Sequence, residues 1–205
     1  RHLAPQLVPG TFVVHFAGAL GVEALEIVRE SDAVPGALHP VQSCPDMETA
    51  LLRLPGSAWG VTCPPEGSDR AERLVRDAGG QPVLVRNQDR AVWHAASATV
   101  ANGTSALLAA GEAMLGAIGV SRPGEILGPL AAGTVANSVE LGAASGLTGP
   151  VARGDLATVQ SHLDALSERA PYLVERYRNA ARLILSAADD GGRLAPETRR
   201  DVLRT

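Results

Sequence analysis

The sequence predicts an α/β layer with mostly parallel strands, followed by an all-α region. Up to about Val85, short apolar runs alternate with helical patterns, which is typical of strands and helices that alternate along a parallel sheet. From Asp89 onward the strand pattern disappears and a helical period continues. Aromatic residues make up only 3% of the chain, so a core of Ala, Leu and Val is expected, which favours closely packed helices.

The expected elements divide the chain into two domains, residues 1–87 and 88–205. Strands are expected over residues 11–15, 37–41, 59–63 and 82–85, with helices over 21–30, 46–54 and 68–78. In the second domain, helices are expected over residues 89–118, 124–141, 155–169 and 172–188, with a short one from Pro196. Asp89 and Asp155 are expected N-caps of their helices.

Composition and charge argue against several classes of function. All 18 basic residues of the 205 are Arg and the net charge is −4, without a basic run, so nucleic-acid binding is not expected. The cysteines, Cys44 and Cys63, match no metal or redox spacing, and we expect both to be reduced core residues; no metal site is predicted. The longest apolar region is interrupted by Asn102 and Glu112, and no signal peptide is recognised, so a cytoplasmic protein without a membrane span is expected.

A glycine-rich phosphate-binding loop does not occur in this sequence. Dinucleotide-binding sheets carry G-x-G-x-x-G on the first strand–helix turn, whereas the turn from Gly18 to Gly21 lacks the paired glycines. We therefore expect that a first βαβ portion of roughly 80–100 residues, with the phosphate-binding loop, is missing ahead of Arg1.

The long helix expected from residue 89 carries polar side chains on one face. At about 100° per residue, His94 shares this face with Ser97, Asn102, Ser105 and Glu112. These are small hydrogen-bonding groups rather than the Arg and Glu of a solvated face. The face is either a polar seam inside a helical bundle or the lining of a cleft, in which His94 donates a proton and Asn102 and Ser105 hold a substrate.

A tight loop before the helix at residue 155 is a second candidate site. Thr148, Arg153 and Asp155 lie where a helix N-terminus offers free amides, and Arg153 could clamp a carboxylate or phosphate. Asp155 and His162 share a face, so the carboxylate could orient the imidazole. The alternative is a capped helix with Arg153 pairing on the surface.

Two histidines end expected strands, where open α/β sheets place ligands. His39 could therefore face a nicotinamide or a substrate, and His15, followed by Gly18, could contact a cofactor. The alternative for each is an ordinary loop histidine with its hydrogen bonds satisfied.

Taken in order, four motifs resemble a family of Rossmann-like two-domain, oxidoreductase-like proteins whose helical C-terminal domain has no known function. The motifs are Val14-His-Phe-Ala-Gly-Ala-Leu-Gly21, Leu38-His-Pro-Val-Gln42, Trp93-His-Ala-Ala96 with Asn102, and Leu147-Thr-Gly-Pro150 with Arg153-Gly-Asp155 and His162. The resemblance implies the C-terminal part of a Rossmann-like parallel sheet, followed by a dimerising helical domain similar to the C-terminal domain of 6-phosphogluconate dehydrogenase.

Relatives of that family imply roles for single residues. In ketopantoate reductases a lysine stands where His94 stands here, with an asparagine near the position of Asn102. In pyrroline-carboxylate reductases a loop similar to the segment from Thr148 to Asp155 binds the substrate carboxylate. His39-Pro40 resembles the strand-end pair of prephenate dehydrogenases. The chain departs from these relatives in having neither the catalytic lysine nor the phosphate-binding loop.

Two functions remain open at this point. The first is an NAD- or NADP-dependent reductase or dehydrogenase, acting as a homodimer on a small carboxylate-bearing carbonyl or imine compound, with NAD or NADP implied by the resemblance. The alternative is a non-catalytic dimeric protein that binds a nucleotide or metabolite.

Overall fold

The structure, a computed structural model, describes residues 6–190 of the chain. These residues fall into two compact units, which divide between Gly103 and Thr104. The division lies inside helix α3 (Arg90–Ala117). The predicted domains instead meet at residues 87 and 88, between the last strand and α3, and that assignment stays a prediction. The expected short helix from Pro196 lies outside the described residues.

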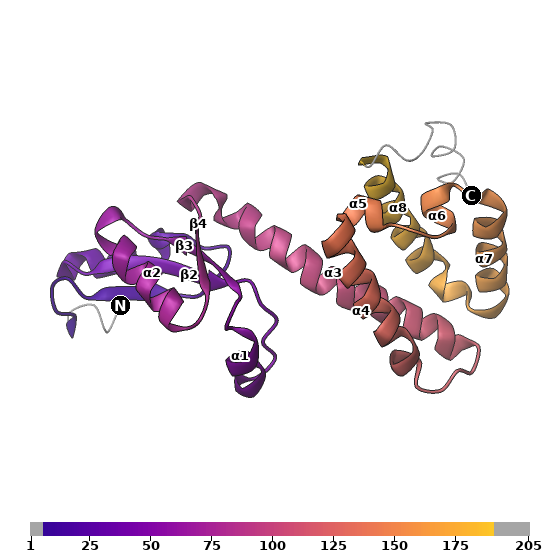
Figure 1. The fold of residues 1–205 in the computed structure, drawn as a ribbon, viewed down its shortest axis with the longest axis horizontal. Helices are drawn as coiled ribbons and strands as arrows, with labels where there is room; N and C mark the ends of the chain where they lie inside the picture. The colour runs from indigo at the N-terminus through magenta and orange to yellow at the C-terminus, as the bar shows by residue number, and fades with distance from the viewer. Residues whose placement is uncertain (1–5, 191–205) are drawn as a thin grey trace. The chain divides into compact units, whose positions relative to one another are not determined.

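A four-stranded sheet organises the first unit (Figure 1). Its strands follow one another in chain order: β1 (Phe12–His15), β2 (Val34–Pro40), β3 (Ala58–Thr62) and β4 (Gln81–Leu84). The helices between them are the 3₁₀ helix η2 (Val22–Ser31), α1 (Met47–Arg53), the 3₁₀ turn η3 (Pro65–Gly67) and α2 (Ser68–Asp77). The predicted α/β layer followed by helices is therefore confirmed.

The sheet is mixed, because one of its three strand pairs is antiparallel. β1 pairs with β2 and β3 with β4 in parallel, whereas β2 and β3 run in opposite directions, with His39 opposite Gly60. A parallel pair needs a crossover element packed on the sheet. The connection from β2 to β3 contains only α1, a seven-residue helix with no buried residue. The chain therefore re-enters the sheet at the end where β2 leaves it.

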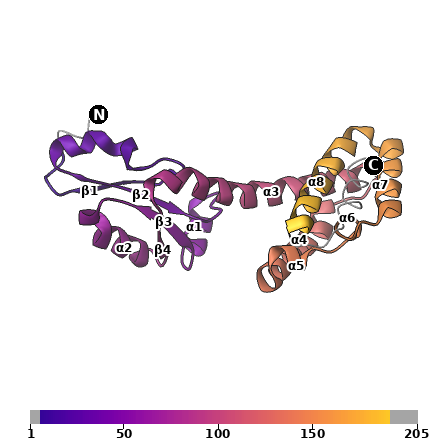
Figure 2. The same ribbon diagram turned by 90° about the horizontal axis from the view of Figure 1, so that it is seen from above.

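The two faces of the sheet are covered by different elements, because side chains alternate along a strand. Leu38, Trp59 and Val61 form one core face with Ala71 and Val75 of α2. Figure 2 shows α2 and the segment of η2 on opposite sides of the sheet. The intervening positions, among them His39 and Gly60, face the N-terminal half of α3. This second face carries the polar groups of the site.

The chain enters α3 through a 3₁₀ turn, η4 (Asn87–Asp89). Asp89 is the last residue of this turn and accepts a hydrogen bond from the Arg86 guanidinium at 2.5 Å; its role as the N-cap of the long helix stays a prediction. The expectation of two core cysteines is also wrong in part, because Cys44 is exposed and Cys63 half-buried; both are free thiols.

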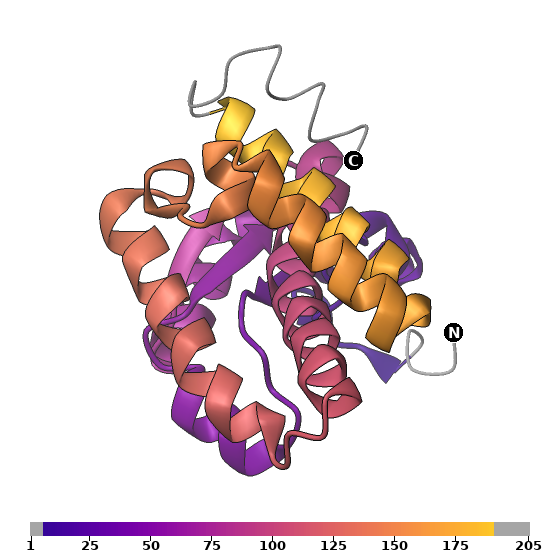
Figure 3. The same cartoon turned by 90° about the vertical axis from the view of Figure 1, so that its right-hand side faces the viewer.

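The second unit consists of helices. After α3 come α4 (Pro123–Leu141), α5 (Ala143–Gly146), α6 (Pro150–Arg153), α7 (Leu156–Arg169), the turn η5 (Pro171–Leu173) and α8 (Val174–Asp190). Figures 1 and 3 show α7 and α8 side by side. Together with α6 they form a buried core of Val151, Val159, Leu163, Ala181 and Leu185. Helix α4, by contrast, has no buried residue.

None of the helices within residues 6–190 combines the length and the apolar character that crossing a membrane requires.

Candidate functional site

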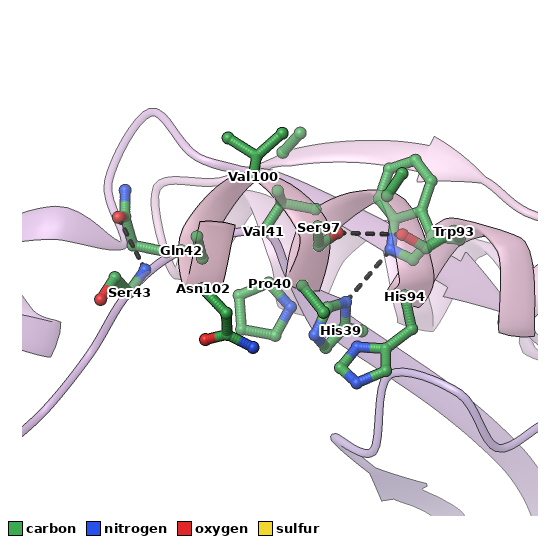
Figure 4. A pocket seen from close by; sticks show the side chains of 14 residues that line it. His39, Pro40, Val41, Gln42, Ser43, Trp93, His94, Ser97, Val100 and Asn102 are labelled. Atoms are coloured by element: carbon green, nitrogen blue, oxygen red, sulfur yellow. Dashed lines mark hydrogen bonds between the residues drawn. The ribbon is translucent and has the colours of Figure 1, made fainter. Parts of the chain in front are cut away.

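A cleft of about 750 Å³ lies in the first unit, beside the end of β2 and the N-terminal half of α3. Much of its lining is apolar, with Pro40, Val41, Ala96 and Val100 among the residues that form it. Its polar lining comes from six side chains: His39, Gln42, Ser43, His94, Ser97 and Asn102. Figure 4 shows the rings of His39, Trp93 and His94 gathered close together, with Asn102 further along the helix.

His39, the penultimate residue of β2, is held by Trp93. The indole Nε1–H of Trp93 donates a hydrogen bond to His39 Nδ1 at 3.1 Å. Burial lowers the pKa of His39 below its ordinary value, and the positive charges of His94 and then Arg90 lower this pKa further. His39 is therefore neutral at neutral pH.

His94 stands edge to face with His39, with ring centroids 5.2 Å apart and an interplanar angle of 84°. The Nδ1 atom of His94 is shielded from solvent and has no hydrogen-bond partner in the part of the chain that the structure describes. A buried ring nitrogen without a partner is costly, and such atoms often mark a functional site. The alternative reading of the long helix, a polar seam inside a helical bundle, does not describe His94, because it lines the cleft.

Gly18 lies directly against both histidines. A Cβ atom placed on Gly18 would come within 2.2 Å of His94 Nδ1 and 2.9 Å of His39 Nε2. These distances are far below ordinary van der Waals contact, so only glycine allows the backbone of this loop to approach the two rings. The structure thus brings together Gly18, His39 and His94, which the sequence analysis selected separately.

Gly60 of β3 performs a similar role on the sheet. A Cβ atom there would come within 2.6 Å of Trp93 Nε1, so the indole lies on the bare backbone of the strand. This close approach allows the indole N–H to reach His39, which pairs with Gly60 in the sheet.

Arg90 is fully buried beneath the site. Its guanidinium donates hydrogen bonds to Thr62 Oγ1 and to three backbone carbonyl oxygens, those of Ala17 at 2.8 Å, Ala37 at 3.1 Å and Gly60 at 3.4 Å. No carboxylate among residues 6–190 forms an ion pair with it. Burial lowers the pKa of Arg90, yet an arginine side chain stays protonated in proteins. A buried positive charge therefore lies next to the histidine pair.

The loop that carries Gly18 is fixed at both ends. His15 Nε2 hydrogen-bonds to Gly21 O at 2.9 Å, and His15 Nδ1 accepts from Ala17 N at 3.2 Å. Both ring nitrogens of His15 are thus used within the loop, and the cofactor contact expected of His15 stays a prediction. His15 shapes the loop that presents Gly18.

Asn87 and Glu23 hold the far side of the same loop. Asn87 Oδ1 accepts from Val22 N at 2.9 Å, and Asn87 Nδ2 donates to Glu23 Oε2 at 2.8 Å. This side-chain hydrogen bond is the main reason that the pKa of Glu23 is lowered. The network connects the start of η2 to the segment that leads into α3.

The other residues expected on the face of the long helix are less close to the histidines. Asn102 lines the cleft but is exposed. Ser105 is exposed, belongs to the second unit and is not among the residues that line the cleft. Glu112 lies against Gly124 of α4, also in the second unit.

The loop candidates all belong to the second unit, where the structure supports a capping role. Asp155 accepts from Thr158 N at 3.1 Å and Thr158 Oγ1 at 2.8 Å, and these hydrogen bonds lower its pKa. His162 hydrogen-bonds through Nδ1 to Tyr177 Oη at 2.8 Å, so the expectation that Asp155 orients it is wrong. Thr148 and Arg153 are exposed, and their role in binding a substrate stays a prediction.

Sequence analysis missed Arg90, Trp93 and Asn87 as parts of the site. Trp93 had a usable signal, since it is one of two tryptophans in the chain and precedes His94. Arg90 and Asn87 had none, because their partners come from segments that lie far away in the sequence. Within the described residues, no group of three or more His, Cys, Asp or Glu side chains is placed to hold a metal ion.

Comparison with protein families places this chain in a known family. The family described as "Domain of unknown function (DUF2520)" matches residues 57–184, more than half of the chain. No protein in the search of curated proteins matches this sequence.

Two of the solved structures that share the fold are similar to this chain over most of its length. Protein TM1727 from Thermotoga maritima superimposes with a TM-score of 0.74 at 22% identity, over 94% of this chain and 75% of its own. BF3122 from Bacteroides fragilis, a proposed NADP oxidoreductase, superimposes with a TM-score of 0.68 at 19% identity, over 84% of this chain and 64% of its own. At these identities the likeness establishes a shared fold.

Proposed function

The chain belongs to the DUF2520 family, and we propose that it is an NAD(P)-dependent oxidoreductase that acts on a small carboxylate-bearing carbonyl or imine compound. The observation that carries the proposal is the neutral His39 packed against His94 beside Gly18, at a largely apolar cleft. Ligand sites of this kind combine apolar walls with a few convergent polar groups.

The residues present fit the nicotinamide end of such a cofactor. The cleft of about 750 Å³ has the size of small-molecule sites, and the buried Nδ1 of His94 still lacks a partner in the described residues. Gly18 provides bare backbone against the two rings, where a side chain would collide with His94. When bound, the nicotinamide would supply the hydride.

The side chains of the cleft suit the remaining tasks. His94 would donate a proton to the carbonyl oxygen or imine nitrogen of the substrate. The Asn102 carboxamide lines the same cleft, and it would hold the substrate through its N–H and C=O groups. The buried charge of Arg90, which no described carboxylate pairs with, favours an anionic substrate by its field.

Oxidation of NADPH, followed by its absorbance, tests this proposal. The protein, with any residues encoded before Arg1, is mixed with a panel of 2-oxo acids and cyclic imino acids. His94→Gln should lower turnover by about 10²–10⁴-fold without loss of folding. His162→Gln is the matched control, because His162 hydrogen-bonds to Tyr177 in the second unit and lines no part of the cleft.

Two outcomes would overturn the proposal. Turnover that is equal in the wild type and in His94→Gln would remove His94 from the reaction. Binding of NADPH or a metabolite without turnover of any compound in the panel would instead favour the non-catalytic binding protein.

A further inference from the structure

The protonation of His39 can be assigned from its partner. An indole N–H can only donate a hydrogen bond, so His39 Nδ1, which receives it from Trp93 at 3.1 Å, carries no proton. A neutral imidazole has one protonated nitrogen, and for His39 this is Nε2.

His39 Nε2 lies near the ring of His94. His39 Nε2 and His94 Nδ1 both approach one point above Gly18, the position that a Cβ atom on Gly18 would occupy. The rings stand edge to face at 84°, so the edge of one imidazole meets the face of the other. A protonated Nδ1 on His94 would therefore bring a second N–H toward that of His39, within a space closed to solvent.

We propose that Trp93 is a positioning residue, which fixes the Nε2–H tautomer of His39 through its hydrogen bond to His39. This tautomer of His39 leaves Nδ1 of His94 unprotonated. A neutral His94 then presents its Nε2–H as the donor to a ligand in the cleft. A neutral donor polarises a carbonyl or imine by hydrogen bonding. The tautomers are inferred from the hydrogen bond and the contacts of a neutral His39, whereas their use on a substrate rests on the proposed function.

The charged groups around His39 agree with a neutral ring. The described cations near His39 are Arg90 and, when protonated, His94, and both lower the pKa of His39, after burial. Arg90 donates hydrogen bonds to four acceptors. It cannot accept a hydrogen bond from either imidazole, because a guanidinium only donates.

Nitrogen NMR of the histidine side chains tests the inference without any ligand. Long-range ¹H–¹⁵N correlations distinguish a protonated from an unprotonated ring nitrogen, and the spectra are recorded near pH 8, above the ordinary histidine pKa of about 6.5. For the wild type we expect a protonated Nε2 and an unprotonated Nδ1 on both His39 and His94.

Two tryptophan variants make the test specific. Trp93→Phe keeps an aromatic ring but removes the donor, so His39 should lose its single tautomer and its two nitrogen shifts should move toward each other, followed by those of His94. Trp59→Phe is the matched control: Trp59 Nε1 has no hydrogen-bond partner in the described residues and its ring packs in the core on the other sheet face. This variant should leave both tautomers unchanged.

A protonated Nδ1 on His39 or His94 in the wild type would overturn the inference, even if Trp93→Phe fails to fold. Unchanged spectra in a folded Trp93→Phe would overturn it as well. Should the expected tautomers be found in a protein that turns over no substrate, the positioning role of Trp93 stands and the proposed function fails.

Discussion

Replacing Gly18 by Ala tests the close approach on which the site depends. The substitution adds one methyl group to a buried position that faces two imidazole rings. The backbone at Gly18 does not have the positive φ that alanine rarely adopts, so the cost comes from the collision alone.

The size of the effect follows from the distances. The new Cβ would lie 2.2 Å from His94 Nδ1 and 2.7 Å from His94 Cγ, whereas non-bonded atoms prefer roughly 3.5–4.0 Å. The ring of His94, or the loop, must therefore move by about 1 Å or more. Overpacking of this kind costs about 1–3 kcal/mol of stability. A displacement near 1 Å at a catalytic group lowers the rate roughly 10²-fold.

Urea unfolding measures the loss of stability, and the NMR signals of the His39 and His94 rings report the displacement. Gly116→Ala is the control, since Gly116 lies in the same helix as His94 and a Cβ atom there meets nothing within 4 Å. Alanine in a helix interior is more stable than glycine by roughly 0.5–1 kcal/mol, so the control should gain stability. A Gly18→Ala protein with wild-type stability and unchanged ring signals would refute the assignment of Gly18 to this contact.

Three further predictions concern pH, assembly and the cofactor. Because the pKa of His39 is lowered in the folded protein, the unfolded chain binds a proton first as the pH falls below about 6.5. The free energy of unfolding should therefore decrease with falling pH in that range, and His39→Gln should flatten this part of the urea-derived curve. We expect a homodimer, because α4 buries no residue and exposes Ile126, Leu130 and Val139; light scattering at micromolar concentration should give twice the chain mass, and a clean monomer would contradict this. The 205 residues alone should bind NADPH with a dissociation constant no better than roughly millimolar, about −4 kcal/mol, as measured by calorimetry; tight binding would mean that a loop of this chain holds the pyrophosphate.

The positions of strands and helices could be predicted from the sequence because they depend on local periodicity. β1, for example, is a short apolar run before a glycine-containing turn, and α2 has apolar positions on one side only. The antiparallel direction of β2 and β3 could not be predicted in this way. It depends on whether α1 packs on the sheet, and the sequence of α1 has enough apolar residues to suggest that it would.

Those residues of the candidate site that lie near the end of a strand or the start of a helix could be predicted from the sequence. His39 lies near the end of a strand and His94 near the start of a helix, and such positions converge in α/β folds. Arg90 shows the limit, because a charged residue at a helix start is usually solvated. Its burial depends on carbonyl groups of Ala17, Ala37 and Gly60, and no local pattern connects these positions.

The hydrogen bonds of Arg90 also determine in which order the first unit can assemble. Its acceptors belong to the loop after β1, to β2 and to β3, so the guanidinium makes its four hydrogen bonds only once all three segments and the first turn of α3 have met. Any opening that separates one of them while the guanidinium stays out of water leaves a buried charge with fewer hydrogen bonds, at a high cost in free energy. Backbone amides of β2 and β3 should then exchange with solvent together with those at the start of α3, as one cooperative unit. The pocket around the histidines would thus be among the last parts of this unit to form and would come apart only together with the sheet.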